Sequence, residues 1–508
     1  MTDVVRLFET ALCQTKKPVR LRPPRTGAHA HALTAVQARM LEFLGGPSLE
    51  RSAAVYVAAA DERSGPLRYP PRPPATLWRS VERGCEVYRS LWDRASLIVH
   101  LDVEYVNFDF PCEPYLSPER AFAAQRPVVE SIRHELARLG IAALQLVTGR
   151  GHHFVWRVRR ATKAYHRLVQ LGRVPRYLEE RYRQVEGPNG ENVELELGAA
   201  FSGLGLVMEY LAHRVQRAAG PRSPVPVQLT AVAAGPSERG REVVSIDISE
   251  YGDPLHTRAI RLPFSPYLKL QQQREVMGEL HVEALPPLWV IPAEGLSERD
   301  ALQTMRDPLA VEALAERCHT RIPDASAGTH RLALEYAGGR LARFHDWFYQ
   351  QEPDPPQAWP ETYDLLPADA LPPCIRIILE QPNDLLLTPT GMQLVVRTLL
   401  GLGWHPRHVA GLLRSKFERD YAWGGMWEHY SPGARADFYT RLFAGLVVAG
   451  EDELVDFNCQ SSREKGYCLD SSCTANLVPY RESLRARICH ERLAHWPVNR
   501  LFLPDEHL

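Results

Sequence analysis

Apolar and polar residues alternate along residues 96–110, which is the pattern of a β-strand with one buried face. The odd positions from 97 to 105 are apolar, whereas His100, Asp102 and Glu104 lie at even positions. Successive side chains of a strand point to opposite faces of its sheet. The pattern therefore predicts a strand with one face in the core and one acidic face.

A helix and two strands are predicted next. Ser117 and Pro118 are suited to the N-cap and first turn of a helix, and Gly140 is suited to its C-terminus. The stretch after this glycine predicts a strand, a turn and a returning strand, namely "IAALQLV" (141–147), "TGRGH" (148–152) and "HFVWRV" (153–158). On the returning strand, His153 is expected on the face opposite Phe154 and Trp156.

A further strand is predicted for "REVVSIDIS" (241–249). Val244, Ile246 and Ile248 would lie on its core side, and Asp247 would lie opposite them. The sequence thus places a third carboxylate on the polar face of a separate strand.

The chain divides into an N-terminal part with both strands and helices and a C-terminal part that is almost wholly helical. Proline-rich stretches interrupt it at 65–75 and 351–374, and the segments after 374 repeat apolar residues three and four positions apart. We therefore expect an α+β fold. The expected parts are a domain of mixed strands and helices, a helical and proline-rich linker region, and a mostly helical C-terminal domain, at residues 1–290, 291–365 and 366–508.

Composition narrows the class of protein. The 508 residues are 45% hydrophobic and 24% charged with a net charge of −1, which is typical of a globular chain of two or three domains. Only six of the 60 basic residues are lysine. This bias supplies guanidinium groups suited to phosphate, although a GC-rich genome would produce the same bias. Neither a membrane helix nor a signal peptide is apparent, so a cytoplasmic protein is expected, with its nine cysteines as thiols or metal ligands.

The acidic positions suggest a metal site. Asp102 and Glu104 project from one strand in the same direction, and Asp247 could complete a site for one or two Mg²⁺ or Mn²⁺ ions. A solvated sheet face is the common alternative for such a pair. Asp109 and Asp253 are nearby alternatives as ligands.

The order of these motifs resembles the archaeo-eukaryotic primase superfamily. "HLDVE", "TGRGHHF" and "VVSIDIS" are similar to its acidic pair, its glycine turn ending in histidine, and its lone later aspartate. "RAIRLPFSPYLK" (258–269) is similar to the family segment that borders the triphosphate. The sequence departs from many members at Tyr267, where they carry histidine, so the role of that histidine is in question here.

The resemblance implies a fold and a set of roles. The fold would be an RRM-like β-sheet with flanking helices and an N-terminal α/β module. Asp102, Glu104 and Asp247 would hold the metals, and His153, which fits the family spacing better than His152, would complete the catalytic group. The implied nucleotide-binding residues are Thr148, Gly149, Arg150, Gly151, His153, Arg258, Arg261, Ser265 and Lys269.

Four cysteines in the C-terminal part of the chain form a second, looser pattern. The local spacing of Cys459, Cys468 and Cys473 fits neither common zinc ribbons nor ferredoxin loops. Together with Cys374 after a double proline, their order resembles the iron-sulfur domain of the primase large subunit, which implies a [4Fe-4S] cluster or, alternatively, zinc. Cys489 or His490 could replace one ligand. No particular role is expected for the remaining cysteines, which are Cys13, Cys85, Cys112 and Cys318.

These resemblances together imply a DNA primase-polymerase, a nucleotidyltransferase that makes or extends primers on single-stranded DNA from NTPs or dNTPs. Other replication or defence proteins are possible partners, and no membrane is expected. Two alternatives remain open at the level of sequence. One is a non-polymerising nucleic-acid-binding subunit, and the other is a metal-dependent nuclease.

Overall fold

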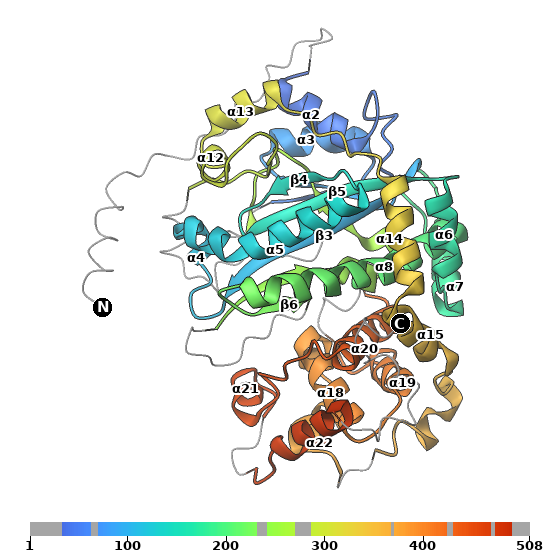
Figure 1. Cartoon of the computed structure of the whole chain (residues 1–508). Coiled ribbons are helices and arrows are strands. Elements are labelled where there is room, and N and C mark those ends of the chain that lie inside the picture. The colour runs from blue at the N-terminus through green and yellow to red at the C-terminus, as the bar shows by residue number, and fades with distance from the viewer. Residues whose placement is uncertain are drawn as a thin grey trace, which may run out of the picture.

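The computed structural model describes residues 33–61, 70–230, 241–269, 286–366, 370–423, 430–468 and 473–489. Figure 1 shows an α/β body built on a twisted sheet and, beneath it, a helical body formed by the later part of the chain. The strands are β1 (Val57–Ala60), β2 (Glu86–Ser90), β3 (Ser96–Asn107), β4 (Leu144–Val147), β5 (Gly151–Arg159), β6 (Val227–Leu229), β7 (Glu242–Asp247), β8 (Ala259–Arg261) and β9 (Ile291–Pro292).

Helices cover the sheets of the α/β body and make up the helical body (Figure 1). In the first they are α2 (Ala35–Leu44), α3 (Leu77–Glu82), α4 (Glu113–Leu116), α5 (Pro118–Leu139), α6 (Lys163–Leu171), α7 (Arg176–Gln184), α8 (Leu195–Ala219), α12 (Glu298–Thr304), α13 (Pro308–Arg317) and α14 (Ser326–Gly338). The chain continues into α15 (Arg340–Gln350), α16 (Pro373–Glu380), α17 (Asp384–Leu387), α18 (Pro389–Gly401), α19 (Pro406–Phe417), α20 (Pro432–Ala449), α21 (Cys459–Glu464) and α22 (Val478–Cys489). The α+β class is therefore confirmed, and the described residues after β9 form no further strand.

The larger sheet has six strands in the order β6-β7-β3-β5-β4-β9. The pairs from β7 to β9 are antiparallel, whereas β6 and β7 are parallel. A smaller antiparallel sheet has the order β1-β2-β8. The apolar face of β3 is fully buried from Leu97 to Tyr105, and both α5 and α8 pack on this strand.

The predicted helix after β3 is confirmed. Its N-cap is Ser117, with Pro118 in the first turn, and its C-cap Gly140 has a φ of 62°. A glycine accepts this left-handed backbone without steric cost. The strand boundaries are shorter than expected, because β3 ends at Asn107 and β7 ends at Asp247. Ile248 is nevertheless buried, at the start of a 3-10 turn, η3 (Ser249–Gly252).

The stretch 291–365, expected to be a linker region, contributes elements to the α/β body. β9 pairs with β4 in the larger sheet, α12 packs on α5, and α14 packs on α5, α6 and α8. Buried apolar side chains from both bodies form one continuous cluster. The proline-rich part before α16 contains a 3-10 turn, η5 (Pro356–Glu361).

Helix α8 is the one helix of the described residues that is long and apolar enough to cross a membrane, when counted with the turn after it (Leu195–Arg222). Of its most apolar 18-residue stretch, 72% is buried inside the protein. It packs on the sheet and on α5, α6, α7, α14 and α15. Its apolar residues therefore belong to the core.

Helix α20 connects the two bodies through buried charged groups. Arg441 donates from Nε to Glu209 Oε2 on α8 at 3.0 Å. Arg435 lies 3.5 Å from Asp253, which follows η3 in the α/β body. Because unpaired buried charges are costly, these pairs fix the position of α20 against the α/β body.

Candidate functional site

The register of the larger sheet brings two of the predicted acids together. Asp102 on β3 lies directly opposite Asp247 on β7, and on its other side it lies opposite His153 on β5. Side chains directly opposite on antiparallel strands have Cβ atoms about 4.5–5.5 Å apart. The sheet therefore places these residues, which are far apart in the sequence, on one patch of its polar face.

The two aspartates repel each other. Burial and the nearby Glu104 carboxylate raise the pKa of Asp102 well above its usual range, and Asp247 adds to the effect. Burial and Glu250 raise the pKa of Asp247 to about 6. One carboxylate oxygen of Asp102, Oδ1, is buried and has no hydrogen-bond partner among the residues that the structure describes. A divalent cation would satisfy this oxygen and remove the repulsion, so the residues fit such an ion.

Glu104 is held differently from the two aspartates. It forms an ion pair with Arg150, and Lys269 Nζ lies 3.1 Å from its Oε1. Burial opposes ionisation of Glu104, but Arg150 and Lys269 lower its pKa well below the usual range. Within the described ranges, no group of three or more His, Cys, Asp or Glu side chains is arranged to hold a metal ion. The expected third metal ligand is thus bound by two cations that were expected to bind phosphate.

The glycines of the turn allow close packing. A Cβ on Gly151 would lie 1.8 Å from the carbonyl oxygen of Val103, and one on Gly149 would lie 2.6 Å from the Tyr267 ring. Neither glycine has a positive φ, so the general expectation that a tight hairpin uses glycine for its backbone angles does not hold here. Gln125 Nε2 donates to the Arg150 carbonyl oxygen at 3.0 Å and anchors the turn.

The two adjacent histidines point to different faces. The His152 ring contacts Phe122 of α5 edge to face at 5.2 Å, on the helix-covered side. His153 lies on the acidic side, with Nε2 3.5 Å from Asp102 Oδ1. Burial and His100 lower the pKa of His153 well below its usual range, so its ring is neutral and able to donate one hydrogen bond. His153, and not His152, is therefore the histidine that lies beside the acids.

The predicted segment 258–269 borders the same patch only in part. The Arg261 guanidinium pairs with Glu86 and lies 4.9 Å from the ring centroid of Tyr267. Arg258 instead pairs with Asp253. The Ser265 hydroxyl accepts from the Val87 amide at 2.8 Å and donates to Pro266, which is a structural role. Among the remaining turn residues, Thr148 is buried.

The sequence interpretation missed two residues of this site, His100 and Glu250. His100 Nδ1 lies 2.9 Å from Glu250 Oε1, and the His100 ring stacks edge to face on His153 at 4.7 Å. Burial opposes protonation, but Glu250 raises the pKa of His100. The position of His100, two residues before Asp102 on the same polar face, was the sequence feature that could have identified it.

The two alternative metal ligands are bound to arginines. Asp109 bonds to Arg241, and Asp253 bonds to Arg258.

The four predicted cysteines lie around one cavity of the helical body, although within the described residues they do not form a group arranged to hold a metal ion. Cys374 in the first turn of α16, Cys459 at the start of α21, and Cys468 and Cys473 line one small cavity of about 30 Å³. Burial and the neighbouring thiols of Cys468 and Cys459 raise the pKa of Cys374 to about 12. None of the four forms a disulfide. The thiolate form of Cys374 is therefore disfavoured unless a positive metal centre stabilises it.

The other cysteines lie elsewhere. Cys85, Cys112 and Cys318 are buried thiols. Cys13, His490 and the side chain of Cys489 lie outside the described residues.

The raised pKa of Asp247 predicts a pH dependence of stability in metal-free protein. Because the folded-state pKa of about 6 exceeds the ordinary value of 3.8, this carboxyl favours folding below pH 4 and loses that contribution as pH rises through 6. Mn²⁺ binds the ionised form, so it should raise the melting temperature more at pH 8 than at pH 5. Scanning fluorimetry of the protein and of Asp247→Asn would measure this. An equal Mn²⁺ effect at both pH values, or one retained in the variant, would contradict the assignment.

Comparisons of the chain with family models, with curated proteins and with solved structures found no match.

Proposed function

We propose that this protein is a template-directed nucleotidyltransferase, a DNA primase-polymerase. The observation that carries the proposal is the pairing of Asp102 with Asp247 across β3 and β7, beside His153 and next to a cluster of cations. Carboxylates that repel each other on one sheet face suit a divalent cation, and cations beside them suit a triphosphate. This combination is what nucleotidyl transfer requires, since positioning and charge neutralisation supply most of its rate.

The order of elements supports the RRM-like part of the proposal. Along the chain, β3, α5, β4, β5, α8 and β7 follow a β-α-β-β-α-β order, and the corresponding strands lie side by side as β7-β3-β5-β4. This is the arrangement of split β-α-β folds. On this reading, β1, β2 and β8 form the smaller sheet of the catalytic domain, facing the acids.

Arg150, Lys269 and Arg261 are the proposed triphosphate ligands. All three lower the pKa of Glu104, so their charges lie close to one carboxylate. A bound triphosphate carries more negative charge than Glu104 and would compete for Arg150 and Lys269. In that exchange Glu104 loses its cations and becomes available beside Asp102 and Asp247 as a third metal ligand. Substrate binding and completion of the metal site would then be coupled.

His153 and the turn backbone would hold the nucleotide. The neutral His153 ring would donate a hydrogen bond to a phosphate oxygen, and the amides of Gly149 to Gly151 would face the same group. Asp102 and Asp247, joined by Glu104, would hold Mg²⁺ or Mn²⁺. When bound, such an ion activates the attacking hydroxyl and stabilises the leaving pyrophosphate.

For the helical body we propose a template-binding role with a cluster at the four cysteines. The thiols of Cys374, Cys459, Cys468 and Cys473 supply the four ligands that a [4Fe-4S] cluster needs, and zinc is the alternative. Arg463 lines the same cavity and carries a charge suited to single-stranded DNA.

Protein purified without oxygen is expected to contain iron and acid-labile sulfide. Cys468→Ser should lose most of the iron, because one of four thiolate ligands is removed. Cys318→Ala, which removes a buried thiol in the α/β body, should retain it. Metal analysis and visible absorption would measure both. Zinc without sulfide would select the alternative, and the absence of any bound metal would contradict the proposed site.

Incubation with labelled NTPs or dNTPs, Mn²⁺ and primer-free circular single-stranded DNA tests the activity. New oligonucleotides that depend on the template are the expected product. Cleavage of the circle without synthesis would identify a nuclease, and DNA binding with neither product would identify a binding subunit. Either result would overturn the proposal.

A further inference from the structure

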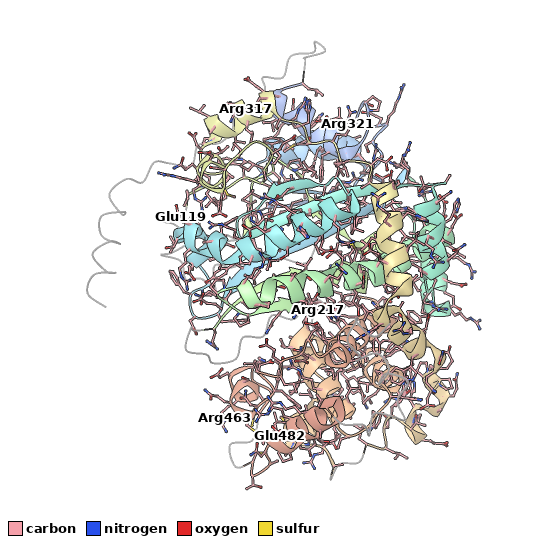
Figure 2. The ribbon with its side chains drawn as sticks, in the orientation of Figure 1. Glu119, Arg217, Arg317, Arg321, Arg463 and Glu482 are labelled. Atoms are coloured by element: carbon pink, nitrogen blue, oxygen red, sulfur yellow. The ribbon has the colours of Figure 1, made fainter. Side chains whose placement is uncertain are left out.

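A second cavity, remote from the paired acids, lies where the two bodies meet. It has a volume of about 200 Å³ and is formed by one face of α8, the start of α15 and the end of α20. Figure 2 places Arg217, which lines this cavity, at the lower edge of the α/β body, next to the helical body. None of the side chains assigned above to metal, nucleotide or cysteine chemistry lines it.

The walls of this junction cavity carry positive charge. Four of the lining residues share one face of α8, because His213, Arg214 and Arg217 follow Tyr210 by three, four and seven positions. Arg340 adds a third guanidinium from α15, and none of the described residues that line the cavity is acidic. Arg214 and Arg217 are held in place by Glu135 and Glu451, at 3.0 Å and 2.7 Å, outside the cavity lining.

One polar group in the cavity wall has an unmet hydrogen bond. His213 is only 5% exposed, and its buried Nε2 has no hydrogen-bond partner in the described part of the chain. Leaving such a group unsatisfied costs free energy, which a ligand that bonds to it would recover. Burial lowers the pKa of His213 to about 4, so the ring is neutral and can donate one hydrogen bond.

The N-terminus of α15 opens on the same cavity. This helix has eleven residues, its N-cap is Gly339, and no side chain caps it. Gly339, Arg340 and Leu341 all line the cavity. The first backbone amides of a helix lack intrahelical acceptors and carry a partial positive charge, which favours an anion.

We propose that this junction cavity binds a small molecule carrying a phosphate group. The arginine side chains, the His213 ring and the α15 amides supply donors for the phosphate oxygens. Phe344 and Val448 supply an apolar wall for a small organic group attached to the phosphate. Because α8 belongs to the α/β body and α20 to the helical body, the bound phosphate would connect the two. The inference does not depend on the proposed polymerase activity.

Calorimetric titration with inorganic phosphate and with a nucleoside monophosphate, at constant ionic strength, tests the proposal. Saturable binding of phosphate to one site of the full chain is expected. His213→Leu and Arg340→Met should each weaken it by about tenfold or more, as expected for the loss of a hydrogen bond to a charged group. Tighter binding of the monophosphate would show that the cavity takes an organic phosphate, and equal binding would show that it takes the phosphate group alone.

Arg343→Met is the matched control, because it removes the same charge from the first turns of α15 at an exposed position that does not line the cavity. It should bind phosphate as the unchanged protein does. Circular dichroism would establish that each variant is folded. Two cavity variants are used so that the test can still be made if one of them does not fold. Absence of saturable binding, retention of binding in both cavity variants, or equal weakening by Arg343→Met would overturn the proposal.

Discussion

Asp247→Asn is expected to lower the rate of nucleotide incorporation by about 10²- to 10³-fold, the usual effect of removing one preorganised group that stabilises transition-state charge. The amide keeps the size of the side chain, and its oxygen can still accept from the Ser249 amide, which lies 2.8 Å from Oδ1. It removes the negative charge that faces Asp102. Primer synthesis on circular DNA, measured with Mn²⁺, reports the effect.

The same substitution should not destabilise the metal-free protein, because it removes repulsion from Asp102. A large loss of activity with an unchanged or higher melting temperature separates a metal ligand from a structural residue. Asp109→Asn is the control, since Asp109 is half exposed and bonds to Arg241 beyond the end of β3. Primer synthesis at the normal rate by Asp247→Asn, or its loss in Asp109→Asn, would show that the metal site is elsewhere.

Glu209→Gln is expected to destabilise the protein by about 3–5 kcal/mol, the usual cost of removing one partner from a buried ion pair. Glu209 is fully buried and accepts from Arg441 of α20, and His345 Nε2 lies 3.0 Å from its other oxygen. Burial opposes ionisation, but His345 and Arg441 lower the pKa of Glu209 to about 2. The substitution therefore leaves a buried guanidinium without its counter-ion, which urea unfolding would measure.

The control for this variant is Glu180→Gln on α7. Glu180 pairs with Arg176, whose side chain is 92% exposed, and exposed pairs of this kind contribute about 0.5 kcal/mol or less. A comparable loss of stability in both variants would show that the buried network does not fix α20 to the α/β body.

Local patterns predicted the elements that hold the site. The alternation on β3 identified the acidic face that carries Asp102, and the capping residues Ser117 and Gly140 identified the limits of α5. The order of the motifs also selected His153, rather than His152, as the candidate site histidine. These features depend on side-chain periodicity or on backbone preferences of single residues, and both are readable along the chain.

Contacts between distant segments were not predictable in the same way. Arg150 of the turn pairs with Glu104 of β3, 46 positions earlier in the chain, and the spacing of the motifs does not predict this contact. Arginine side chains usually lie on the solvent-exposed face of a helix. Arg435 and Arg441 of α20 are nevertheless buried against acids of the α/β body. Spacing alone did not reveal the convergence of the four cysteines, since it depends on how α16 and α21 pack.

The continuous apolar cluster has a consequence for how the protein can be divided. A cut at residue 365 would uncover buried apolar side chains on both fragments, together with charged partners such as Glu209 and Arg441. Each fragment expressed alone would expose an apolar surface and tend to aggregate. The two halves are therefore expected to fold as one unit.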